Sequence, residues 1–274
     1  MSTDLLKIEF YFPPQEHIAS KTELVDFIVE NIKENGSMEY SGFMDENDLK
    51  ESISQHIGNG NITTYSKLDD SIKNVIKDQI EATAEKCNSL LPIPTKNFVF
   101  VFPFSPTIDD AVFGGTMGVA PYSCVLHVYL SLDKWTPETL SDTIAHELNH
   151  TIFYYHHYDE FGHYTLQDEI LIEGLAENFR EKITNPKISP WASAVERGEV
   201  KEILESMRDI LLLKDQNTIK GVLFGNSKYK RWTGYSVGYW IAKKFIEDNP
   251  NMSWEQIMKT PVSVMIDNFM TKKV

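Results

Sequence analysis

Hydrophobic residues recur at helical spacing in the middle of the chain, and they predict one long amphipathic helix. The residues expected to form its buried stripe are Leu140, Ile144, Leu148, Ile152 and Tyr155. Thr136 is a typical N-cap, Pro137 suits the first helical position, and Glu138 favours the positive end of the helix dipole. Because no Gly or Pro follows until after Phe161, this helix should continue without a break past residue 150.

The same patterns predict the other elements. Strands are expected at residues 5–12, 97–102 and 123–130. Further helices are expected at residues 22–32, 45–57, 68–90, 166–179, 192–213 and 232–248, and two short ones between residues 254 and 270. The expected fold class is therefore α+β, with a small mixed sheet packed beside two central helices. Residues 1–95 would form a mostly helical N-terminal region, and residues 96–274 a second region with a mainly helical end. Both could belong to one continuous domain.

The central helix carries the sequence His146-Glu147-x-x-His150. On a helix the two histidines lie about 40° apart and one turn apart, so both imidazoles can reach one metal ion. Glu147 lies on the flank of the same face. Catalytic zinc needs neutral nitrogen ligands and a nearby carboxylate that can take a proton from a water molecule, which this arrangement offers.

Two histidines leave a catalytic zinc ion one protein ligand short. Glu173 is the preferred third ligand, because it lies among apolar residues of a second helix, where an unpaired carboxylate would be costly. Gly174 beside it would let this helix pack closely against the first. His156 and His163 remain alternatives, although on a continuous helix His156 points about 80° away from His146.

The two motifs together resemble the gluzincin metallopeptidases. His146-Glu147-x-x-His150 is followed, 23 positions later, by Glu-Gly-Leu-Ala-Glu at residues 173–177. The likeness is greatest to bacterial predicted Zn-dependent proteases, and it extends over about residues 98–248. It implies a zincin-like fold and one zinc ion per chain, held by His146, His150 and Glu173. It also implies that Glu147 acts as general base and then acid, and that Glu177 orients a ligand histidine.

The resemblance also suggests residues that contact the substrate. Enzymes of this type often place a tyrosine or histidine beyond the glutamate helix, where it donates to the oxyanion. Tyr235 is the first choice for that role and Tyr239 the second. The strand before the zinc helix would bind a substrate peptide along its edge, with Val125, His127 and Tyr129 on one face.

The overall charge narrows the range of partners. A net charge of −14 argues against nucleic acid and against anionic membrane surfaces. The resemblance to metallopeptidases implies that the substrate is a peptide or protein. Cys87 and Cys124 are the only cysteines and have no CxxC spacing, so neither a disulfide framework nor a cysteine zinc site is indicated. No secretory leader or membrane-spanning run is recognisable, so a cytoplasmic protein is expected.

These observations lead to a functional hypothesis and one alternative. The hypothesis is a zinc metallopeptidase in which Glu147 assists the attack of water on a peptide bond. The alternative is a non-catalytic zinc-binding protein with a regulatory or protein-interaction role. A complete general base favours the enzyme, since a purely structural zinc site has no need of one.

Overall fold

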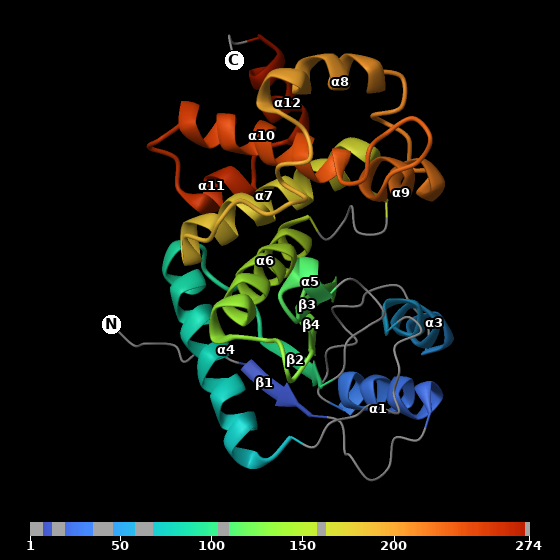
Figure 1. Ribbon diagram of the computed structural model, residues 1–274, viewed down its shortest axis with the longest axis vertical. Coiled ribbons are helices and arrows are strands. Elements are labelled where there is room, and N and C mark those ends of the chain that lie inside the picture. The colour runs from blue at the N-terminus through green and yellow to red at the C-terminus, as the bar shows by residue number, and fades with distance from the viewer. Residues whose placement is uncertain are drawn as a thin grey trace. The chain divides into compact units, whose positions relative to one another are not determined.

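The computed structural model describes residues 8–12, 20–34, 46–57, 68–103, 110–157 and 163–271 (Figure 1). The chain divides into two compact units. One comprises residues 1–89 and 93–155, and the other comprises residues 90–92 and 156–274. The division expected from the sequence, between residues 95 and 96, stays a prediction.

The first unit contains a four-stranded mixed sheet. Its strands are β1 (Ile8–Tyr11), β2 (Asn97–Phe102), β3 (Thr116–Tyr122) and β4 (Val125–Leu130). The strand order is β1-β2-β4-β3, in which β1, β2 and β4 run parallel and β3 is antiparallel to β4. The expected small mixed sheet is confirmed, and with it the α+β class.

The two inner strands are buried along their whole length. Every residue of β2 and of β4 is buried, as their nearly continuous runs of apolar and aromatic residues predict for strands covered on both faces. On one face, ring contacts link neighbouring strands. The Tyr11 and Phe100 rings stack at 4.8 Å, and those of Phe102 and Tyr129 at 5.0 Å. These contacts fix the register of the parallel strands.

Five helices accompany this sheet in the described part of the first unit. They are α1 (Lys21–Glu34), α3 (Glu46–Ile57), α4 (Asp70–Leu90), α5 (Asp110–Phe113) and α6 (Pro137–His156). Helix α3 contacts both α1 and β3. The α4 residue Lys77 lies over the rings of Phe10 and Phe12, so α4 covers the face of the sheet to which Phe10 points.

In the described part of the second unit, all the regular secondary structure is helical. Its helices are α7 (Leu166–Thr184), the 3-10 turn Arg197–Glu199, α8 (Val200–Met207), α9 (Gln216–Phe224), α10 (Thr233–Asp248), α11 (Trp254–Met258) and α12 (Val262–Thr271). Helices α7 and α10 form the centre of this unit. The close packing expected of Gly174 is with α10, where a Cβ atom on Gly174 would lie 2.2 Å from the backbone of Gly238.

The largest differences from the sequence-based expectation concern three elements. Strand β3 was not expected, because Gly118 and Pro121 are poor strand formers and pairing with β4 outweighs their local preference. Helix α9 was also missed, although its N-cap Asp215 accepts a hydrogen bond from the backbone of Thr218 at 2.8 Å. The helix expected at residues 192–213 is shorter, and α8 ends at Met207.

None of the helices in the described part of the chain is both long and apolar enough to cross a lipid bilayer.

Candidate metal centre

Helix α6 begins where the sequence predicted. The Thr136 hydroxyl accepts a hydrogen bond from the Thr139 backbone at 3.2 Å, and the Thr139 hydroxyl accepts one from the Thr136 backbone at 3.0 Å. The predicted stripe from Leu140 to Ile152 is buried. Its last member, Tyr155, is 40% exposed, so that part of the prediction was wrong. Tyr155 lies in the last turn, where its polar hydroxyl favours water.

His146 and His150 face each other on this helix. Their Nε2 atoms are 3.0 Å apart, and their ring centroids are 4.6 Å apart in an edge-to-face arrangement. The ring of Tyr154 stacks on His150 at 6.1 Å. Two nitrogen ligands of a tetrahedral zinc ion are separated by about 3.3 Å, so the spacing of the imidazoles suits such an ion.

Glu173 completes a group of three potential ligands. It lies in the middle of α7, between the buried residues Ile172 and Leu175. One ligand atom each from His146, His150 and Glu173 lie within 4.8 Å of one another, so these residues could hold a metal ion. Two imidazoles and one carboxylate form a donor set that catalytic zinc sites use.

The alternative ligands are not in this group. Among the residues that the structure describes, the group contains neither His156 nor His163. His156 lies in the last turn of α6, as expected from an uninterrupted helix, and burial together with the nearby Lys259 lowers its pKa. His163 is exposed just before α7.

Glu147, the candidate general base, lies against strand β3. Its side chain is 7% exposed. A Cβ atom added to Gly118 of β3 would lie 2.3 Å from its Cγ and 2.8 Å from its Oε1. The carboxylate is therefore held between α6 and the backbone of an outer strand, close to the histidine pair of the same helix.

The expected substrate-binding strand must be corrected. Strand β4, which carries Val125, His127 and Tyr129, lies between β2 and β3, so its backbone is paired on both sides. Side chains alternate along a strand, and Gly118, which is paired with Val128, faces Glu147. His127 and Tyr129 thus point to the opposite face, where both are buried among aromatic rings. In the described sheet, β3 and β1 are the two outer strands, and β3 is the one that pairs with β4.

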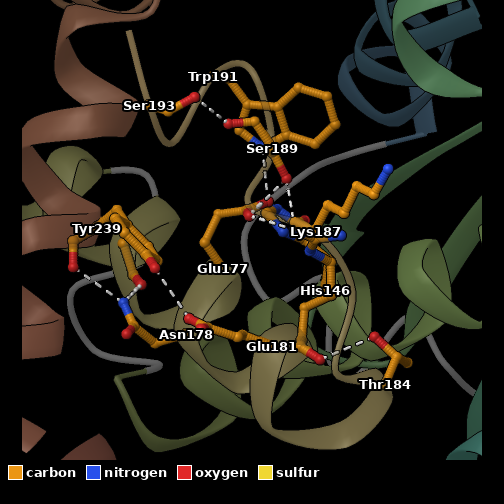
Figure 2. Close-up of polar contacts among 12 residues, drawn as sticks. His146, Glu177, Asn178, Glu181, Thr184, Lys187, Ser189, Trp191, Ser193 and Tyr239 are labelled. Carbon is orange, nitrogen blue, oxygen red and sulfur yellow. Dashed lines mark hydrogen bonds and ion pairs between the residues drawn. The ribbon is translucent and has the colours of Figure 1, made fainter. Parts of the chain in front are cut away.

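Glu177 is the centre of a buried hydrogen-bond network (Figure 2). It accepts hydrogen bonds from Nη2 of Arg180 at 3.0 Å, Oγ of Ser189 at 2.9 Å and Nε1 of Trp191 at 2.5 Å. Glu177 is 1% exposed, and Ser189 and Arg180 are buried with it. Sequence reasoning missed all three donors. Arg180 at position i+3 on the same helix was a usable signal, but Ser189 and Trp191 come from the loop that follows.

The two candidate tyrosines have different surroundings in the second unit. Tyr235 lies in the first turn of α10, partly buried, with its ring 6.0 Å from that of Phe224. The Tyr239 hydroxyl donates to Oε2 of Glu181 at 3.0 Å (Figure 2). It also accepts a hydrogen bond from Nζ of Lys243 at 2.8 Å. Burial is the largest influence on Tyr239 and raises its pKa.

A site of two histidines and a glutamate, with a second glutamate beside the histidines, is the kind of site found in zinc-dependent hydrolases. The chain belongs to the family described as "Predicted Zn-dependent protease (DUF2268)", which matches residues 72–267. This confirms the expected likeness to the predicted Zn-dependent proteases.

The chain is also similar to one curated bacterial protein. An uncharacterized protein of Bacillus subtilis (strain 168), YjfC, is 24% identical over 152 residues. The match covers 50% of this chain and 48% of the relative, so the chain spans about half the length of the curated relative. No solved structure matches the chain.

Proposed function

We propose that this protein is a zinc-dependent peptidase that hydrolyses peptide bonds. The observation that carries the proposal is the convergence of ligand atoms from His146, His150 and Glu173, with the buried carboxylate of Glu147 on the same helix. The family description supports zinc and proteolysis. Glu147 is adjacent to His146, so it is available for proton transfer beside the ion.

Zinc held by these three residues would supply a Lewis acid that polarises a carbonyl group and makes a water molecule more acidic. The protein itself contributes a general base, Glu147, and a hydrogen-bond donor. Glu147 takes a proton from the attacking water and later delivers it to the leaving amine. Tyr235 donates a hydrogen bond to the developing oxyanion. Glu177 orients a ligand histidine by accepting its ring N–H.

The outer strand β3 favours a peptide as substrate. An extended peptide can add to the outer strand of a sheet through backbone hydrogen bonds, and Glu147 lies directly against β3 at Gly118. A peptide bound there would pass next to the general base. The net charge of −14 makes an anionic polymer such as nucleic acid an unsuitable substrate.

Metal analysis of the purified protein tests the zinc site. We expect about one zinc ion per chain by elemental mass spectrometry, and a loss of zinc in Glu173→Ala. Glu169→Ala, one turn earlier on α7, is the matched control and should retain zinc. Zinc retained in Glu173→Ala would contradict the proposed ligand set, and absence of zinc from the reconstituted wild type would refute the proposal.

A peptide-library assay tests the reaction. Glu147→Gln should keep zinc but lose on the order of 10²–10⁴-fold in turnover, because the amide cannot accept the proton. Full turnover in Glu147→Gln would exclude Glu147 as the general base. A wild type that binds zinc but cleaves no peptide of the library would indicate the alternative, a zinc-binding protein without catalysis.

A further inference from the structure

Gly118 has no room for a side chain. A Cβ atom there would lie 2.3 Å from Cγ of Glu147 and 2.7 Å from Cγ2 of Thr143. Carbon atoms that are not bonded pack at about 3.5–4.0 Å, so even a methyl group would displace one of the two side chains. The backbone conformation at position 118 does not require a glycine. Among the described glycines, only Gly114, Gly115 and Gly225 have positive φ.

The two side chains nearest to a Cβ atom at position 118 come from one face of α6. Thr143 and Glu147 are one helical turn apart, and both lie against the same point of β3. The absence of a side chain thus lets this face of the helix approach the strand backbone closely. Glu147 is 7% exposed in the resulting space, so the strand restricts where its carboxylate can lie.

We propose that Gly118 is a positioning residue for Glu147. The bare backbone at this point holds the carboxylate at the level of strand β3, where a substrate peptide would pair. A side chain at position 118 would move the carboxylate away from the reacting atoms without touching a zinc ligand. The catalytic part of this inference rests on the proposed function, whereas the contact between Gly118 and Glu147 is independent of it.

The contact is tested by melting temperatures of the full-length protein. Gly118→Ala should lower the melting temperature by several degrees. In a Glu147→Ala background the fall should be smaller, because Cγ and Oε1 are gone. When Thr143→Ser is added, the fall should nearly vanish. Gly198→Ala is the matched control, since nothing lies within 4 Å of a Cβ atom there.

The inference would be overturned if Gly118→Ala lowered the melting temperature equally in the wild type, in Glu147→Ala and in the Glu147→Ala, Thr143→Ser double variant. If Gly118→Ala does not fold, a folded protein recovered in the Glu147→Ala, Thr143→Ser background would support the contact. If Gly118→Ala also failed to fold in that background, the proposed contact would be refuted. The melting temperatures require no peptidase activity. They therefore test whether position 118 contacts Glu147 even if the proposed function is wrong.

Kinetics and metal content then test the catalytic consequence. Gly118→Ala should retain zinc and an unchanged KM, while kcat falls on the order of 10–100-fold, because a misplacement of about 1 Å costs that much. Gly198→Ala should keep wild-type kcat and KM. A KM that rises with kcat unchanged, or loss of zinc in Gly118→Ala, would overturn the positioning role.

Discussion

Gly174 of α7 lies so close to Gly238 of α10 that neither position has room for a methyl group. A Cβ atom on Gly174 would lie 2.2 Å from the Gly238 carbonyl, and one on Gly238 would lie 1.8 Å from the Ile170 oxygen. The backbone of Gly238 cannot move aside without shifting the helix. The side chain of Asn178 also joins the helices, since it donates to the backbone oxygens of Gly174 and Tyr239 at 2.8 and 3.0 Å.

The first prediction concerns this helix pair. Gly174→Ala and Gly238→Ala should each lower the free energy of unfolding by about 1–3 kcal/mol, because the added carbon overpacks the crossing. Zinc binding should weaken as well, since Glu173 precedes Gly174 and would move with the helix. Urea unfolding measures the first effect and competition with a chelator the second. Gly198→Ala is the control, and losses below about 0.5 kcal/mol would contradict the prediction.

The second prediction concerns Trp191, whose indole donates to Glu177. Trp191→Phe keeps the aromatic ring but removes a hydrogen bond to a buried carboxylate, which should cost about 1.5–3 kcal/mol of stability. If Glu177 orients a ligand histidine, zinc affinity should also fall about 10–100-fold.

Trp240→Phe is the matched control for this effect. Its indole donates to the backbone oxygen of Val195 at 2.9 Å, so the variant also loses one hydrogen bond in the second unit. It should lose about 1 kcal/mol of stability and keep its zinc affinity. Equal zinc affinities in Trp191→Phe and Trp240→Phe would argue against a role of the Glu177 network in metal binding.

The third prediction separates the two tyrosines. Tyr235→Phe should lower kcat about 10²–10³-fold with little change in stability, if its hydroxyl donates to the oxyanion. Tyr239→Phe should lower stability and leave kcat within a few-fold, because the Tyr239 hydroxyl is engaged by Glu181 and Lys243. The opposite pattern in steady-state kinetics would assign the oxyanion donor to Tyr239.

Short-range patterns were enough to predict much of the structure. The start of α6, its passage through His150, and the helices α7 and α10 follow from caps and apolar spacing within a few turns of chain. The central strands β2 and β4 follow from their apolar runs. Glu173 was placed on a helix among buried residues for the same reason.

What the sequence did not reveal depends on partners distant in the chain. Strand β3 forms because β4 pairs with it, so neither its existence nor its outer position could be read from Gly118 and its neighbours. That error placed the substrate strand on β4. The donors of Glu177 were missed because Ser189 and Trp191 return to it from the loop after α7, 12 and 14 residues on.

The last prediction concerns the two cysteines, which are buried and free. Burial raises the pKa of the Cys87 and Cys124 thiols from 9.0 to about 12. Between about pH 9 and pH 12 the unfolded chain therefore loses thiol protons that the folded chain keeps. Because the unfolded state then binds fewer protons, stability should fall as the pH rises through this window.

The size of the effect is on the order of 1 kcal/mol per thiol between pH 8 and pH 10. Urea unfolding at both pH values measures it, with the Cys87→Ala, Cys124→Ala double variant as the comparison, since lysines and tyrosines titrate alike in both proteins. In the native protein at pH 8, neither thiol should react with a disulfide reagent, because the thiolate is the reactive form. Rapid reaction of the folded protein with the reagent would contradict the raised pKa values. So would an equal loss of stability between pH 8 and pH 10 in the wild type and the double variant.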